Sequence, residues 1–351
     1  MPMAKYDSGD PAGQMEKALQ LSRWNSFEER RKESRVRGKL RGIGCGVFVE
    51  PAGAGGSPKE ESAIKFGESG NAELYVVSGP SGQGHETVYP EVAAEVLGLD
   101  PESITLHASD PDGPPLVGDG TIGSRSMMNH GSAVFMAARA AVQKGTELAA
   151  KALEVAKEDL EFSKGGYRVK GTDVSIRFSE LVRRYGSQLD SKGENPQHST
   201  FPGGVHVAEV EIDPDTGALE LLRYVAVDDC GRVVNHTLLE GQIHGGIVQG
   251  LGQAFGEHVV YDRESGQLLT GTFMDYFMPR ADQAPGFELH DHSLASPNNP
   301  LGVKGAGEAG TTGAVPTIAN AVIDALRPLG INTLDFPFSP GRVWAAIAAK
   351  R

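Results

Sequence analysis

Glu308 is the acid whose position in the sequence most invites a chemical explanation. It lies in the stretch LGVKGAGEAGTTGAVPTIANAV (residues 301–322), among glycines and directly before an apolar run with helical character. A carboxylate next to a helix N-terminus is favourable electrostatically and needs no catalytic role. The flanking glycines weaken that explanation, because a residue that only complements a helix dipole does not need a bare backbone on both sides. Glu308 is therefore a candidate functional acid on a loop that other groups approach closely.

The same local arrangement recurs along the chain. A glycine-rich loop precedes a helix of small residues at 79–87, 118–126 and 302–313, and in a looser form at 241–250. Helix N-termini carry free N–H groups and partial positive charge, and they suit anionic ligands. The sequence therefore predicts an anion held largely by backbone groups.

Common nucleotide and zinc motifs do not account for these loops. Gly79 and Gly84 have the spacing of a phosphate-binding loop, but His85 and Glu86 stand where Lys and Ser/Thr are required. Tyr89 stands where the second histidine of a His-Glu-x-x-His zinc site is required. A nucleoside triphosphate with magnesium is therefore excluded as the ligand.

Neutral side chains on these loops offer donors and acceptors for a polar heterocycle and a phosphate together. They are Gln83, Thr121, Ser124, Ser126, Gln242 and Gln249. For any one of them alone, a helix cap or a surface position is the commoner explanation. Arg125 suits either a phosphate or an acidic neighbour, and His85 and His244 suit packing or hydrogen bonding better than metal ligation.

Composition limits the partners. The formal net charge of −13 argues against a nucleic-acid or anionic-membrane surface as the main partner. No run approaches the roughly 20 apolar residues of a membrane helix, and residues 1–17 lack the apolar core of a signal peptide. Cys45 and Cys230 lie in no Cys-x-x-Cys motif, so reduced thiols in the cytoplasm are favoured over a disulfide.

The order of predicted elements favours an α+β fold, because helices and strands are mixed with hairpins rather than strictly alternating. Helices are expected at 14–35, 127–156, 235–257 and 340–349, a hairpin at 205–229, and a second hairpin around 264–266. Residues 228–232 are expected to form a polar turn, and 290–292 a loop.

Six motifs in one order carry a family resemblance. They are GQGHET, GTIGSRS, DDCGRVVN, GQIHGGIVQGLGQAF, TGTFMDYFMPRA and NPLGVKGAGEAGTTGA. Together they resemble the molybdopterin-binding large subunit of the xanthine dehydrogenase/aldehyde oxidase family, in particular its carbon-monoxide-dehydrogenase-type and related bacterial members. The resemblance runs from about Lys5 to the C-terminus and looks like the C-terminal half of that subunit.

The resemblance implies a fold and a cofactor. The fold would be the α+β type of a molybdenum-cofactor-binding domain, in two packed subdomains with mixed sheets and hairpins. We expect 1–60 to link to the missing half, 61–200 to form the first subdomain, and 201–351 to form the second. The cofactor would be molybdopterin with molybdenum, and the cytosine dinucleotide form is left open.

The resemblance also assigns roles residue by residue. Glu308 would be the general base facing molybdenum, and no protein ligand to the metal is implied because the pterin dithiolene holds it. The cofactor contacts would be Gln83, Gly84, Thr121, Gly123, Ser124, Arg125, Ser126, Gln242, Lys304 and Gly305.

The implied partners follow from what this chain lacks. In the family that the chain resembles, electrons pass to iron–sulfur clusters and usually FAD, and two cysteines are too few to hold such clusters here. The resemblance therefore implies an iron–sulfur small subunit, an FAD medium subunit and the N-terminal half of the large subunit as partners. The substrate would be a small aldehyde, N-heterocycle or related molecule. The competing interpretation is a non-catalytic half-subunit for cofactor binding or assembly, or a degenerate paralogue. Intact Glu308, Gln83 and the GSRS sequence argue against degeneration.

Overall fold

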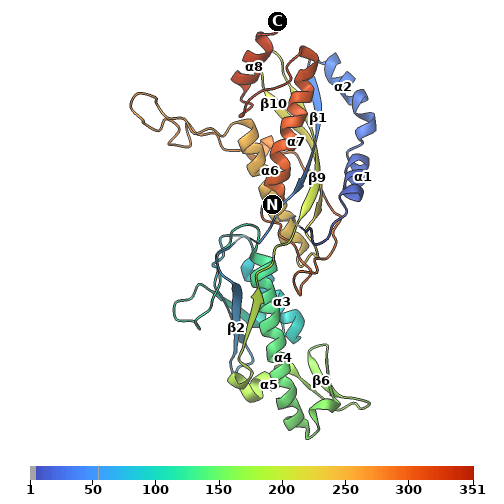
Figure 1. The fold of residues 1–351 in the computed structure, drawn as a ribbon, viewed down its shortest axis with the longest axis vertical. Helices are drawn as coiled ribbons and strands as arrows, with labels where there is room; N and C mark the ends of the chain where they lie inside the picture. Colours follow the sequence, from blue (N-terminus) through green and yellow to red (C-terminus); the bar gives the residue numbers. More distant parts are fainter. Residues whose placement is uncertain (1–4, 54) are drawn as a thin grey trace.

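Two four-stranded sheets organise the chain, and they lie toward opposite ends of an elongated molecule (Figure 1). The computed structural model describes residues 5–53 and 55–351. The order of strands is β1-β9-β10-β11 in the first sheet and β4-β3-β2-β8 in the second, and a small third sheet has the order β5-β6-β7. The α+β fold with mixed sheets is thereby confirmed, because antiparallel and parallel pairs occur in the same sheets.

The first sheet is buried on both faces. Its strands are β1 (Leu40–Val49), β9 (Gly203–Ile212), β10 (Leu219–Asp229) and β11 (Phe287–Asp291). Along β9, Val205 and Val207 pack toward α1 and α2, whereas Ala208 and Val210 pack toward α6 and α7. This alternation buries nine of the ten residues of β9, as a strand covered on both faces requires.

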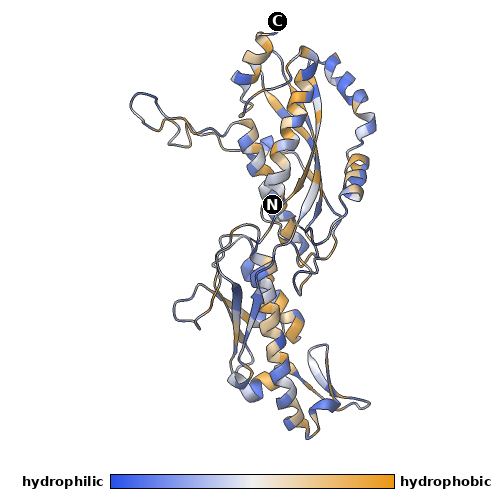
Figure 2. Ribbon diagram, in the orientation of Figure 1, coloured by the Kyte–Doolittle hydropathy of each residue, from blue (hydrophilic) through white to orange (hydrophobic). Residues whose placement is uncertain are grey.

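Helices pack on both faces of this sheet. They are α1 (Pro11–Leu21), α2 (Phe27–Val36), α6 (His236–Phe255) and α7 (Ala309–Leu326), and α8 (Pro340–Ala348) closes the chain. Alternate glycines on β1 let α7 lie directly on the strand: a Cβ at Gly44 would come within 2.2 Å of the backbone nitrogen of Ala321. Helix α2 is hydrophilic along most of its length (Figure 2), in keeping with its sequence FEERRKESRV.

The second sheet and its helices form the other end of the molecule. Its strands are β2 (Lys59–Phe66), β3 (Ala72–Val76), β4 (Ile104–Ala108) and β8 (Ser191–Pro196). The helices are α3 (His85–Leu97), α4 (Ser132–Leu153) and α5 (Phe178–Tyr185), and a π-helical turn (Met127–Gly131) leads into α4. The small sheet comprises β5 (Leu160–Ser163), β6 (Gly166–Val169) and β7 (Ser175–Arg177). One hydrophobic core joins these elements.

The N-terminal segment belongs spatially to the first sheet. Strand β1 pairs antiparallel with β9 over its whole length, and Phe27 of α2 packs against Val205 and Val207. Residues 5–49 thus lie on the unit formed mainly by 201–351. The boundaries 1–60, 61–200 and 201–351 remain a proposal about the domains.

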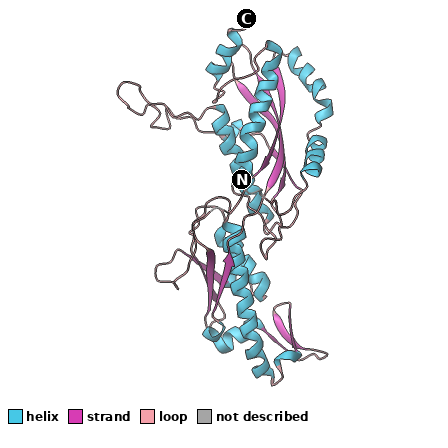
Figure 3. Ribbon diagram, viewed as in Figure 1, coloured by secondary structure: helices cyan, strands magenta, loops and turns pink. Residues whose placement is uncertain are grey.

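Several local expectations differ from the structure. The helix expected at 14–35 is two helices, α1 and α2, separated by a short 3-10 turn at Trp24–Ser26. The hairpin expected around 264–266 lacks strands: it has one isolated bridge, Tyr261 to Leu268, in an arm that projects from the molecule without helix or strand (Figure 3). Too few neighbours pack on this arm to extend the pairing.

Two further expectations about polar segments are wrong. Asp228 and Asp229 are buried in the last two positions of β10 rather than in the expected turn, which is limited to the residues after Asp229. His290 and Asp291 belong to β11, which pairs parallel with β10. Charged residues are poor strand formers by composition, and here pairing with β10 overrides that preference. None of the helices among the described residues is long and apolar enough to cross a membrane.

Candidate functional site

A pocket of about 160 Å³ lies where the two ends of the molecule meet. Its walls come from the start of α3, the loop before α4, the start of α6, and the segment before α7. The lining residues that the sequence predicted are Gln83, Thr121, Ser124, Ser126, Gln242 and Lys304. The glycine loops therefore converge on one site, as the sequence predicts, although they are more than 200 residues apart at the extremes.

Thr121 is the centre of the polar contacts on one wall. The amide of Gln83 donates a hydrogen bond to Thr121 Oγ1 at 3.3 Å, and the Ser126 hydroxyl donates to the same oxygen at 3.1 Å. Ser78 and Thr121 share a further hydroxyl contact of 2.8 Å. These contacts orient neutral donors and acceptors at the pocket without using any charged group.

Glu308 lies beside this wall and is held by Ser124. The Ser124 hydroxyl donates to Glu308 Oε2 at 2.9 Å and accepts the backbone N–H of Glu308 at 3.0 Å. Ser124 has a φ of +53°, in the left-handed region that residues other than glycine rarely adopt. Such a conformation in a non-glycine residue is often found at functional sites.

Three helix N-termini at the site lack a side-chain cap. The N-cap residues are Gly84 for α3, Ser126 for the π-helical turn, and Glu308 for α7, and none of these side chains accepts a capping hydrogen bond. Gly84 has a φ of +82° and is packed against Leu238 of α6. The free N–H groups of these turns are available to an anionic ligand.

Two buried aromatic side chains in the lining carry unpaired polar atoms. His85 Nδ1 and the Tyr89 hydroxyl have no hydrogen-bond partner among the described residues, and the two rings stack at 4.6 Å between centroids. Burial, with a smaller effect of the nearby His130, lowers the pKa of His85 to about 4. His85 therefore presents a neutral imidazole near pH 7.

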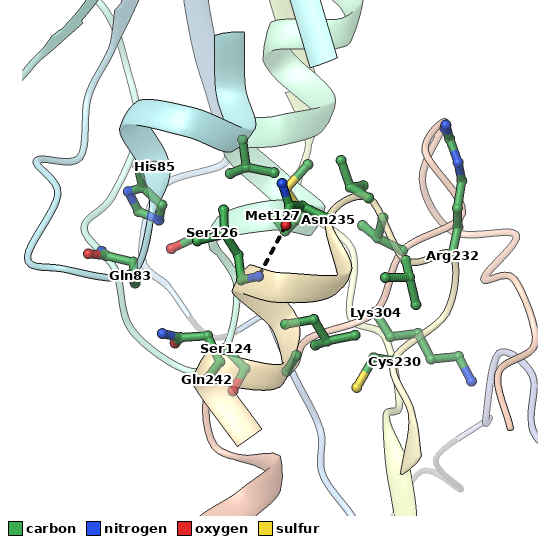
Figure 4. A pocket seen from close by; sticks show the side chains of 18 of the residues that line it. Gln83, His85, Ser124, Ser126, Met127, Cys230, Arg232, Asn235, Gln242 and Lys304 are labelled. Atoms are coloured by element: carbon green, nitrogen blue, oxygen red, sulfur yellow. Dashed lines mark hydrogen bonds between the residues drawn. The ribbon is translucent and has the colours of Figure 1, made fainter. Parts of the chain in front are cut away.

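Both basic residues in the lining are already paired. Lys304 is buried, and its Nζ lies 2.6 Å from Asp229 Oδ2 and 3.1 Å from the carbonyl oxygen of Ser8. Arg232 pairs with Glu95 at 3.0 Å. Figure 4 shows the ends of Lys304 and Arg232 pointing away from Gln83, Ser124, Ser126 and Gln242. The side of the pocket that carries the amides and hydroxyls is thus free of positive side chains.

Four predicted contacts lie outside the pocket lining. Arg125 is fully buried and pairs with Glu60, so it meets an acidic neighbour, the second of the two roles considered for it. The other three are Gly84, Gly123 and Gly305. Gly305 packs tightly against Ser124, since a Cβ there would lie 2.7 Å from the Ser124 carbonyl oxygen. Gln249 accepts a hydrogen bond from Thr311 on α7 and does not line the pocket.

Some pocket residues were not found by sequence reasoning. Asn235, labelled in Figure 4, caps α6, because its side chain accepts the N–H of Leu238 at 3.1 Å. Its amide also donates to Glu91 at 3.1 Å. Val234, Leu238 and Met127 supply an apolar floor. Asn235 before an apolar helical run is a recognisable cap signal, whereas nothing local marks the apolar residues as pocket lining.

The pocket fits part of a molybdopterin. It offers amides, hydroxyls, uncapped helix N-termini and two unpaired buried polar atoms, which suit a pterin and its phosphate. Its volume is below the roughly 300–1,000 Å³ of pockets that enclose a drug-sized ligand. Among the described residues, no group of three or more His, Cys, Asp or Glu side chains is arranged to hold a metal ion. The amides, hydroxyls and helix N-termini of this pocket suit the organic part of the cofactor.

Comparison with known proteins identifies the family of the chain. The molybdopterin cofactor-binding domain family matches residues 17–285. The chain is 34% identical to the carbon monoxide dehydrogenase large chain of Hydrogenophaga pseudoflava, over 98% of this chain and 45% of that protein. The chain thus spans about half the length of the relatives that it matches.

Solved structures show the same fold. Carbon monoxide dehydrogenase from Oligotropha carboxidovorans superposes with a TM-score of 0.90 at 32% identity, over 98% of this chain and 46% of that chain. Quinoline 2-oxidoreductase from Pseudomonas putida 86 gives a TM-score of 0.88 at 30% identity, over 97% and 46%. The chain belongs to the molybdopterin cofactor-binding domain family and is homologous to the large subunits of molybdenum-containing hydroxylases of the xanthine dehydrogenase/aldehyde oxidase type.

Proposed function

We propose that this chain is the C-terminal portion of the molybdopterin-binding large subunit of a molybdenum hydroxylase or dehydrogenase. The observation that carries the proposal is the position of Glu308, whose carboxylate is held by Ser124 beside a pocket of neutral donors. A base fixed next to the reacting group is what proton abstraction in such an enzyme requires. Nothing comparable is needed by a subunit that only stores or delivers the cofactor.

Each residue has a task in this proposal. Gln83, Thr121, Ser126 and Gln242 bind the pterin and its phosphate through neutral hydrogen bonds, and the backbone N–H groups at the start of α3 add to them. The molybdenum–pterin group, when bound, supplies the redox chemistry. Ser124 orients Glu308, and Glu308 takes the proton.

The substrate class follows from family membership rather than from the pocket. We propose a small aldehyde, N-heterocycle or related molecule, because the relatives named above include enzymes for carbon monoxide and quinoline. A pocket that holds only part of a large cofactor also needs further walls. We propose that the N-terminal half of the large subunit supplies them, and that iron–sulfur and FAD subunits carry the electrons onward in the cytoplasm. The free thiols of Cys45 and Cys230 are compatible with that compartment.

Molybdenum and pterin analysis of material co-purified from the native host tests this function. We expect stoichiometric molybdenum, a second large chain bound to this one, and a pterin whose extraction identifies its mononucleotide or dinucleotide form. A complex that contains both chains but neither molybdenum nor pterin would contradict the enzymatic proposal. It would instead favour the non-catalytic half-subunit.

A further inference from the structure

Glu50 is a buried carboxyl group next to the candidate base, and the family resemblance assigns it no role. It follows the last residue of β1, and its backbone N–H donates to the carbonyl oxygen of Pro202 at 2.9 Å. The residue is 9% exposed, and neither carboxyl oxygen has a hydrogen-bond partner of good geometry among the described residues. A buried, unpaired carboxylate destabilises the folded state, so the group must either take up a proton or gain a partner that offsets its charge.

Three chain segments pack together around Glu50. Gly53 donates its N–H to the carbonyl oxygen of Gly123 at 2.9 Å, which joins the loop after β1 to the loop that carries Ser124. A Cβ at Gly305 would lie 2.5 Å from Ala52 Cβ and 2.8 Å from Ser124 Cβ, so the loop before α7 lies against both. These contacts place the loop that carries Glu50 beside Ser124, and Glu308 is close enough for its charge to act on the Glu50 carboxyl group.

No cation offsets the charge of Glu50 in this cluster of described residues. The groups that act on its carboxyl are the Ser124 hydroxyl and Glu308. The thiol of Cys230, directly after β10, has a raised pKa, mainly because of burial. The charges of Asp228, Asp229 and Glu50 raise that pKa further. Lys304, the buried lysine of the pocket lining, is bound to Asp229. Asp228 is in turn bound to His206.

These surroundings favour the neutral form of Glu50. Burial is the largest effect and raises the pKa of Glu50, the nearby Ser124 hydroxyl lowers it, and the charge of Glu308 raises it, with a net pKa of about 7. Two carboxyl groups in contact do not both ionise readily, so one of the pair keeps a proton. Glu50 is the more enclosed of the two, because Glu308 is exposed.

We propose that Glu50 is a positioning residue that stands as a neutral carboxylic acid beside Glu308 and keeps Glu308 as the ionised member of the pair. The role rests on the proposed function of Glu308 as a base. A neutral Glu50 donates its proton toward Glu308 while Ser124 binds the same carboxylate, so the base is oriented from two sides. An ionised Glu50 would instead repel Glu308 from that position.

Thermal unfolding of the 351-residue chain and of Glu50→Gln, measured from pH 5 to pH 8, tests the neutral state without any cofactor. The pKa of Glu50 is raised from 4.5 to about 7 in the folded protein, so the folded state holds the extra proton between these values. Wild-type stability therefore falls as pH rises through this window. Glutamine is isosteric with the neutral acid and cannot ionise. We expect the Tm of Glu50→Gln minus that of the wild type to rise by at least about 2 °C across the range.

Two controls separate this effect from a general one. Glu161→Gln removes an exposed carboxyl group on β5, outside the pair. The Tm of this variant should change with pH in the same way as that of the wild type. In a Glu308→Gln background, the pH at which the Glu50→Gln difference develops should move downward, because the neighbouring charge is gone. If Glu50 had only a structural role, the pH at which the Glu50→Gln difference in Tm develops would be the same with Glu or Gln at position 308. In the loaded enzyme, Glu50→Gln should also lose the decline of kcat at high pH while KM changes little.

A Tm difference that is constant from pH 5 to pH 8 would overturn the proposal, because it would show that Glu50 ionises alike in the folded and unfolded chain. An unchanged pH window in the Glu308→Gln background would overturn the pairing. Neither result depends on molybdenum. If the native complex lacked molybdenum while the pH effect was present, the carboxyl pair would stand and the proposed function would fall.

Discussion

Ser124 and Glu308, which are 184 residues apart in sequence, are joined by two hydrogen bonds through one hydroxyl group. The oxygen of Ser124 donates to the carboxylate and accepts the backbone N–H of the same glutamate. The position of the candidate base thus depends on a serine whose own backbone is in the left-handed region. This link ties the loop before α4 to the start of α7.

Ser124→Ala should impair the orientation of Glu308. A hydrogen bond to a charged group contributes about 1.5–3 kcal/mol, so we expect kcat to fall by about 10- to 100-fold with a smaller change in KM. The measurement is steady-state kinetics of the reconstituted enzyme. Ser109→Ala is a matched control, because Ser109 also has a positive φ, of 55°, and lies away from the pocket. A kcat of Ser124→Ala within twofold of wild type would contradict the orienting role.

Glu308→Gln should remove the base while leaving the cofactor bound. The amide preserves the shape of the side chain, and none of the proposed pterin contacts is lost. We expect molybdenum content to stay at the wild-type level and kcat to fall by about 10²- to 10⁴-fold, the usual contribution of a general base. Glu102→Gln, at an exposed site beside β4, is the control. Activity that stayed within a few fold of wild type would rule out Glu308 as the base.

Gly310 permits the close approach of α6 and α7 beside Glu308. A Cβ at this position would lie 2.4 Å from the carbonyl oxygen of Ile243 and 2.7 Å from the nitrogen of Ile247. Because backbone atoms cannot give way as side chains do, Gly310→Ala should destabilise the protein by about 1–3 kcal/mol. Chemical denaturation measures the change.

Gly245→Ala is the matched control for that substitution. Gly245 is an exposed glycine within α6, and a Cβ there meets nothing within 4 Å. Alanine is the better helix former, so we expect a gain of about 0.5–1 kcal/mol. Equal effects of the two substitutions would show that crowding between α6 and α7 is not what selects glycine at 310.

His85 should make the protein sensitive to mild acid. Its pKa is lowered from 6.5 to about 4 by burial and by His130, so the unfolded chain binds the proton more readily between these values. The stabilisation is therefore present above pH 6.5 and is lost as pH falls toward 4. Between these two pH limits, the free energy of unfolding should change by about 3 kcal/mol because of His85. His85→Phe keeps a ring against Tyr89 and removes the titration.

The measurement compares the free energies of unfolding of wild type and His85→Phe between pH 7 and pH 4. We expect the wild type to lose stability relative to the variant over that range. His258→Gln removes an exposed imidazole elsewhere and should leave the wild-type slope in place. Parallel curves for wild type and His85→Phe would show that His85 titrates alike in both states.

The sequence by itself determined the local helix starts and turns, and it identified the family. Glycine before a run of small residues marks the starts of α3 and α7, and the Asp-Pro-Asp-Thr-Gly turn marks the hairpin of β9 and β10, because these features depend on residues next to one another. The same local reasoning found Gln83, Thr121, Ser124, Ser126 and Gln242, which meet at one pocket.

Only the tertiary structure decided what each charged group faces. The sequence leaves Arg125 open between a phosphate and an acidic neighbour, and the family resemblance predicts that Lys304 contacts the cofactor, yet Glu60 and Asp229 bind them. Glu50 looks like the polar end of a strand, yet it is enclosed beside Glu308. The physical reason is that a buried charge must be paired or neutralised, and its partner is chosen by the packing of distant segments rather than by adjacent residues.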